Sequence, residues 1–143
     1  MDFLITTNPL TWYEALIRVV AAVVVGALVG LDREYKNRPA GLRTHSLVCL
    51  GATVVAILEG LLVWRLLALD GPESVNVSIG RISAQVVSGI GFLGAGTIFV
   101  AQKKVSGLTT AAGLWNVACL GLMIGFGYYW LALIVAGMIT VVL

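Results

Sequence analysis

The chain alternates between five long runs of apolar residues and short polar segments. The runs cover residues 12–31, 46–69, 82–101, 110–126 and 129–143. A helix that crosses the hydrocarbon core of a bilayer needs roughly 20 predominantly apolar residues. The pattern therefore predicts an all-α bundle of about five transmembrane helices in a single domain, residues 1–143. The fifth run, of about 15 residues, is short for a full crossing.

The positions of the basic residues predict how this bundle is oriented. They gather in the loops that follow the first and third runs: Arg33, Lys36, Arg38, Arg43, Lys103 and Lys104. Cytoplasmic loops of membrane proteins are enriched in Lys and Arg. We therefore expect these two loops and the C-terminus in the cytoplasm, and the N-terminus outside.

The composition narrows the possible classes of protein. Hydrophobic residues make up 59% of the chain and charged residues only 11%, whereas a soluble domain carries about 25% charged residues. Such a chain has too few charged side chains to cover the surface of a globular protein, which argues against a soluble enzyme. A formal net charge of +2 is too small for the basic surface that a nucleic-acid-binding domain needs. The two cysteines, Cys49 and Cys119, lie inside apolar runs, where we expect small buried hydrophobic side chains.

Glycines are frequent inside the apolar runs. Gly26 and Gly30 lie one turn apart in the first run, and Gly121 and Gly125 do so in the fourth. Small residues at this spacing let the backbones of membrane helices approach closely. Most of the seventeen glycines are therefore expected at interfaces between helices.

A short motif recurs where the chain re-enters the apolar phase. Gly-Leu-x-Thr stands at residues 41–44 and again at 107–110. In each copy, a threonine is predicted to cap the next helix. Two explanations remain open. In the first, helices one and two form a pseudosymmetric repeat of helices three and four. In the second, two Gly- and Leu-rich hairpins resemble each other by chance.

Ionisable groups inside a membrane span are candidates for a functional site. Here they are Glu14, Arg18, Glu59 and Arg65, of which Glu59 lies deepest; salt bridges among them are the structural alternative. Carboxylates are too few and too dispersed for the oxygen ligands that Mg²⁺ prefers. This scarcity counts against a dedicated Mg²⁺ carrier, and we expect no bound metal or cofactor. No nucleophile, base and acid come together in the sequence, so no enzymatic activity is expected.

Three motifs, in this order, carry a resemblance to a known family. They are Gly30-Leu-Asp-Arg-Glu34 with Pro39-Ala-Gly-Leu-Arg-Thr44, the run from Ala84 to Gly96, and Gly107-Leu-Thr-Thr-Ala-Ala112 with Trp115. Over about residues 16–137 the chain resembles the MgtC/SapB family of bacterial inner-membrane proteins. Members usually carry a cytoplasmic C-terminal domain of ACT-like fold. We expect this chain to lack that domain and to be part of a longer protein.

The resemblance implies a role in adaptation to low Mg²⁺ and, in pathogens, in survival inside macrophages. Some members restrain the ATP synthase by contacting its membrane sector, and many are named Mg²⁺ transporters. Two functions therefore stay open. The first is regulation through helix contacts, as a homodimer or with a membrane partner such as ATP synthase. The second is transport of magnesium or another cation.

The resemblance also implies a set of motif residues that bind a partner or ligand. To these we add Glu59, because of its depth in the second run. The motif residues are Arg33, Glu34, Gly41, Arg43, Thr44, Gln85, Ser88, Gly91, Gly94, Gly96, Thr109, Thr110, Trp115 and Asn116.

Overall fold

The structure, a computed structural model, describes residues 10–70, 78–101 and 104–143. Within these ranges it contains five helices and one short antiparallel hairpin, which confirms the predicted helical bundle. The helices are α1 (Trp12–Tyr35), α2 (Leu42–Asp70), α3 (Arg81–Gly96), α4 (Leu108–Gly125) and α5 (Tyr129–Val142). The strands β1 (Phe99–Ala101) and β2 (Lys104–Ser106) lie between α3 and α4.

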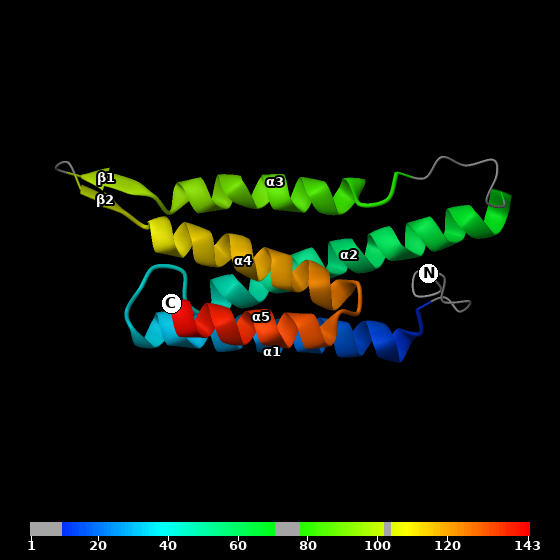
Figure 1. Cartoon of the computed structure of the whole chain (residues 1–143), viewed down its shortest axis with the longest axis horizontal. Coiled ribbons are helices and arrows are strands. Elements are labelled where there is room, and N and C mark those ends of the chain that lie inside the picture. Colours follow the sequence, from blue (N-terminus) through cyan, green and yellow to red (C-terminus); the bar gives the residue numbers. More distant parts are fainter. Residues whose placement is uncertain (1–9, 71–77, 102–103) are drawn as a thin grey trace.

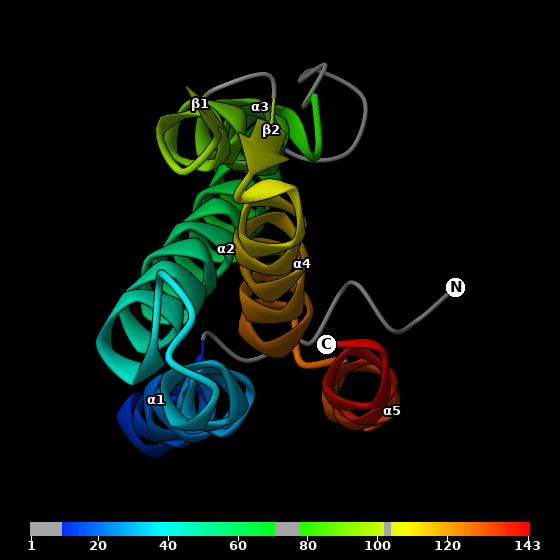
Figure 2. The same cartoon turned by 90° about the vertical axis from the view of Figure 1, so that its left-hand side faces the viewer.

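The helices form three layers (Figures 1 and 2). Helix α3 makes one outer layer, α2 and α4 cross in the middle, and α1 and α5 lie on the other side. The loop 36–41, the β1–β2 hairpin and the end of α5 lie at one end of the molecule, which we call the basic end. The two loops expected in the cytoplasm therefore share one end with the end of α5. Their orientation in a bilayer stays a prediction.

Three of the helices are long and apolar enough to cross a membrane, namely α1, α2 and α4. Helix α5 is apolar but has only 14 residues, which extend over about 21 Å. A hydrocarbon core is about 30 Å thick. Length and composition thus support three spans among the described residues, and the predicted five crossings are not established.

The predicted helix 82–101 is wrong over its last turn. Helix α3 ends at Gly96, and Val100 pairs with Val105 in the hairpin. Branched and aromatic residues flank this pair, and such residues favour a strand over a helix end. The hairpin leads into Gly107, which has a φ of +90° and is the N-cap residue of α4. The polar loop is also shorter than expected, because α1 continues to Tyr35 and α2 begins at Leu42.

Helix α2 is held at the centre by glycines of two neighbours. A Cβ on Gly26 of α1 would lie 2.8 Å from the carbonyl oxygen of His45, and one on Gly121 of α4 would lie 2.3 Å from that of Cys49. Thr53 of α2 also donates a hydrogen bond to the carbonyl oxygen of Gly121, at 2.8 Å. Only glycine fits at such approaches, so the expectation of close helix contacts is confirmed there.

The two helical hairpins differ in how closely they pack. Gly26 in the first hairpin contacts α2, but a Cβ on Gly91 in the second hairpin would meet nothing within 4 Å. Gly94 packs against Ala111 at 3.4 Å, an ordinary contact. The pseudosymmetric repeat therefore stays a prediction. Cys49 is fully buried, as expected, and Cys119 is half-buried.

Candidate functional site

Arg33 lies at the basic end, in the last turn of α1, and only 3% of it is exposed. Its guanidinium donates a hydrogen bond to the hydroxyl of Thr110 on α4, while its Nε is buried without a partner. No salt bridge to Arg33 forms within the described residues, and the carboxylate of its sequence neighbour Asp32 pairs with Lys36 at 2.9 Å. The structure thus holds a buried cation whose charge is not neutralised by an ion pair.

A cavity of about 400 Å³ opens beside this arginine. We call it the basic-end cavity. Its polar lining comes from the loop after α1, the hairpin region and the start of α4: Arg33, Arg38, Thr97, Ser106, Thr109 and Thr110. Three of the predicted motif residues, Arg33, Thr109 and Thr110, are therefore brought together although they are far apart in the sequence.

Glu34 shapes the loop that forms one wall of this region. Its Oε2 accepts a hydrogen bond from the amide of Leu42 at 2.9 Å, and a Cβ on Gly41 would lie at the same distance from it. Glu34 therefore caps the start of α2, and Gly41 has to be small. Arg43 and Thr44 are exposed on the first turn of α2.

The predicted threonine caps are wrong in both copies of the Gly-Leu-x-Thr motif. At α2 the cap comes from Glu34. At α4 no side chain caps the helix, and the hydroxyl of Thr110 instead accepts from Arg33. The sequence spacing was suitable for a cap in both copies. In the folded chain, Glu34 caps α2, and the hydroxyl of Thr110 accepts a hydrogen bond from Arg33.

Glu59, the deepest carboxylate, is buried with only 2% exposed. It accepts hydrogen bonds from the amides of Ile82 and Ser83, at 3.2 and 3.0 Å, and from the hydroxyl of Ser83. The first amides of a helix have no partner inside it and carry partial positive charge. Glu59 on α2 therefore satisfies the start of α3, which gives this buried carboxylate a structural role.

Arg18 also serves a helix end. Its Nη1 donates to the carbonyl oxygen of Gly125, the last residue of α4, at 2.6 Å. A cation at this position complements the negative end of the helix dipole. Glu14 binds the amide of Thr11 instead. The salt bridges considered for Glu14, Arg18 and Glu59 are therefore not formed in the described part of the chain.

The outer face of α3 carries most of the other predicted residues. We define this outer face by its exposed residues Ala84, Gln85, Ser88, Gly91, Phe92, Ala95 and Gly96. A Cβ on Gly89, Gly91 or Gly96 would meet nothing within 4 Å. Gly94 instead faces α4, and Asn116 donates to the carbonyl oxygen of Ala112 in its own helix at 2.9 Å rather than to another helix. Trp115 is 43% exposed.

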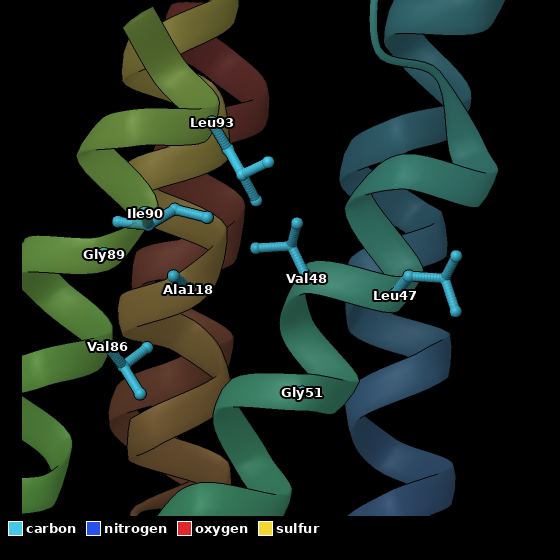
Figure 3. Close-up of a pocket in the computed structure, with 8 residues that line it drawn as sticks. All are labelled: Leu47, Val48, Gly51, Val86, Gly89, Ile90, Leu93 and Ala118. Carbon is cyan, nitrogen blue, oxygen red and sulfur yellow. The ribbon is translucent and has the colours of Figure 1, made fainter. Parts of the chain in front are cut away.

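An apolar groove of about 400 Å³ lies between α2, α3 and α4 (Figure 3). Val48 of α2 and Ile90 of α3 project into it from opposite sides, and Ala118 of α4 lies behind them. All its lining residues are apolar or glycine. Gln85, Ser88 and Asn116 do not line it, so this groove does not join the polar side chains of α3 and α4 into one aqueous path.

In the described ranges, no group of three or more His, Cys, Asp or Glu side chains is placed so that it could bind a metal ion. The sequence did not point to Arg38 or Thr97 as neighbours of Arg33. The branched and aromatic residues Ile98, Phe99 and Val100 were the available signal. They indicate a strand, and the hairpin brings the start of α4 back toward the loop that follows α1.

These features define a helical membrane protein whose central helix α2 packs against glycines of α1 and α4, and which has a basic end. The chain matches the MgtC family over residues 19–143 and belongs to that family. No solved structure matches it.

Three curated relatives illustrate the similarity. The chain is 44% identical over 117 residues to "Protein MgtC" of Salmonella typhimurium strain LT2, covering 82% of this chain and 46% of that protein. It is 40% identical over 116 residues to "Putative magnesium transporter YhiD" of Escherichia coli K12, covering 81% and 53%. It is 41% identical over 118 residues to an uncharacterized Synechocystis protein, covering 82% and 46%. The chain thus spans about half the length of the curated relatives that it matches.

Proposed function

We propose that this chain is a regulatory membrane component that acts in magnesium homeostasis by contact between its α3 outer face and a helix of another membrane protein. The open glycines of that face carry the proposal. A Cβ on Gly91 or Gly96 would meet nothing within 4 Å, whereas neighbouring helices occupy the space beside Gly26 and Gly121. Small residues on a membrane helix allow a second helix to approach closely.

The role of magnesium in this proposal comes from the family and its relatives. Membership of the MgtC family and the printed name of the Escherichia coli relative both point to magnesium. A bacterial inner membrane, with the basic end in the cytoplasm, fits the distribution of Lys and Arg. The occupants of the α3 outer face that we propose are a second copy of the chain or the membrane sector of ATP synthase. No catalytic role is part of the proposal.

Transport of Mg²⁺ or another cation is the second candidate, because a relative carries a transporter name. The placement of the intramembrane charges favours regulation. Glu59 binds the start of α3 and Arg18 binds the end of α4, so neither is free to form a cation path without opening a helix end. Gln85 and Ser88 lie on the exterior of α3.

The test compares two glycine-to-leucine variants that both have open space around them. Gly91→Leu places a bulky side chain on the α3 outer face, and Gly137→Leu does the same on α5. Cross-linking in membranes, followed by mass spectrometry, identifies the partner of the wild-type chain. We expect Gly91→Leu to abolish that cross-link and Gly137→Leu to retain it. Retention of the same partner by Gly91→Leu would overturn the proposal.

Flux measurements separate the two candidate functions. Purified protein in proteoliposomes should show no Mg²⁺ flux above that of empty vesicles. A flux that Gln85→Ala abolishes would favour transport over regulation. Gln85 is suited to this test because it is exposed and its replacement leaves the helix caps intact.

A further inference from the structure

We propose that the basic-end cavity binds a phosphate group, carried by a phospholipid headgroup or by free phosphate. The cavity combines two guanidinium groups with hydroxyls and the start of a helix. Arg33 and Arg38 line it from one side, and Thr109 and Thr110 line it from the start of α4. None of these four side chains is a carboxylate, and the two guanidinium groups attract an anion rather than a cation.

The first argument is the state of Arg33. It is buried, and its Nε has no partner among the described residues. Its guanidinium donates to the neutral hydroxyl of Thr110. A buried charge is unfavourable unless a counter-charge and hydrogen bonds compensate it. A bound phosphate supplies both, because guanidinium binds phosphate oxygens through paired hydrogen bonds.

The second argument is the start of α4. Its first intrahelical hydrogen bond runs from the amide of Ala111 to the carbonyl oxygen of Gly107, and its N-cap residue, Gly107, has no side chain that could cap the helix. The amides that precede Ala111 therefore have no partner inside the helix, and the helix dipole adds partial positive charge there. Anions bind at such helix starts.

Gly107 makes this arrangement possible. Its φ is +90°, and a Cβ at this position would lie 1.9 Å from the carbonyl oxygen of Thr97. The hairpin and the start of α4 can therefore meet closely only at a glycine. This close approach holds Thr109 and Thr110 against the end of α1, where Arg33 lies.

The cavity also has an apolar side. Phe99 of β1 and Val142 of α5 line it together with the polar groups. Its volume of about 400 Å³ falls in the range of about 300–1,000 Å³ that is typical of small-molecule sites. A phospholipid headgroup with the first part of its glycerol ester fits this mixture of surfaces. Free phosphate uses the same donors and leaves the apolar side unfilled.

The test uses purified protein in a neutral detergent after removal of native lipid. Thermal unfolding is measured with sodium phosphate against sodium chloride at equal ionic strength. Native mass spectrometry then measures retention of phosphatidylglycerol against phosphatidylcholine. A higher unfolding temperature in phosphate than in chloride identifies free phosphate as a ligand. Selective retention of phosphatidylglycerol identifies a lipid headgroup as the ligand. Either result supports the proposal. Absence of both effects would overturn it.

Four variants locate the site. Arg33→Lys keeps the charge but loses the fork of donors, and Arg38→Gln and Thr109→Val remove groups that are exposed. We expect each to weaken binding about tenfold, the effect of one charge-assisted hydrogen bond. Arg43→Gln is the matched control, because Arg43 is an exposed arginine of the same end that does not line the cavity.

The control distinguishes a site from general attraction to positive charge. Equal losses with Arg43→Gln and Arg38→Gln would overturn the proposal. If Arg33→Lys fails to fold, the exposed positions 38 and 109 still decide the outcome. Binding unchanged in both Arg38→Gln and Thr109→Val would also refute the site. The cavity and the α3 outer face are separate surfaces, so the test is independent of the proposed function.

Discussion

Replacing Gly121 by alanine tests the close contact between α4 and α2. A Cβ at this position would lie 2.3 Å from the carbonyl oxygen of Cys49 and 2.8 Å from the Cβ of Ala52. Nonbonded atoms prefer separations of about 3.5 Å, so α4 would have to move away by roughly 1 Å. The oxygen of Cys49 belongs to the backbone of α2 and cannot turn aside as a side chain can.

The expected loss of stability has two parts. Overfilling a close-packed interface costs about 1–3 kcal/mol. The shift also stretches the 2.8 Å hydrogen bond from Thr53 to Gly121, and such bonds between membrane helices average about 0.6 kcal/mol. Alanine has a higher helix propensity than glycine, which offsets up to about 1 kcal/mol of this loss of stability. We therefore expect Gly121→Ala to lower the free energy of unfolding by about 1–3 kcal/mol.

Unfolding by sodium dodecyl sulfate in mixed micelles, followed by circular dichroism, measures this change. Gly60→Ala on α2 is the matched control, because a Cβ there would meet nothing within 4 Å. The control variant should be as stable as the wild type or slightly more stable. Equal stability of Gly121→Ala and Gly60→Ala would refute the close approach of the two helices.

Two further predictions concern helix starts. Gly107 and Gly80 both have φ near +90°, but only at Gly107 would a Cβ meet another group, the carbonyl oxygen of Thr97. Thermal unfolding should therefore show a loss of about 1–2 kcal/mol for Gly80→Ala, from backbone strain alone, and a clearly larger loss for Gly107→Ala; similar losses would contradict the contact. Glu59→Ala removes the acceptor of the Ser83 amide and hydroxyl, which should cost about 2–4 kcal/mol and speed hydrogen exchange in the first turn of α3. Glu59→Gln keeps one acceptor oxygen and should cost less, whereas unchanged exchange in Glu59→Ala would show that this cap is not needed.

Much of the fold could be predicted from local patterns. Apolar runs marked all five helices, because each residue that faces lipid or another helix must be apolar or small. Glycine spacing marked the contacts at Gly26 and Gly121. Local pattern failed at residues 97–101, where apolar residues suited both a helix end and a strand. The pairing of Val100 with Val105 decided in favour of the strand.

The candidate site was only partly predictable. The motifs singled out Arg33 and Thr110, but their hydrogen bond joins residues 77 positions apart, and no local rule predicts it. Glu59 was recognised as a buried carboxylate, yet its partners on α3 became visible only once α2 and α3 lay side by side. The roles assigned to the motif residues stay predictions.

The amino-acid sequence by itself determined that this is a membrane protein of helices, where the helices lie along the chain, and which end is basic. These properties follow from composition and periodicity, which act over a few residues. Tertiary structure decided which charged side chains bind helix ends and which remain without such a partner. Glu59 and Arg18 satisfy helix ends, whereas Arg33 is buried beside a cavity and forms no ion pair with the residues that the structure describes. That distinction depends on which helix ends meet which side chains, and only the packed bundle brings them together.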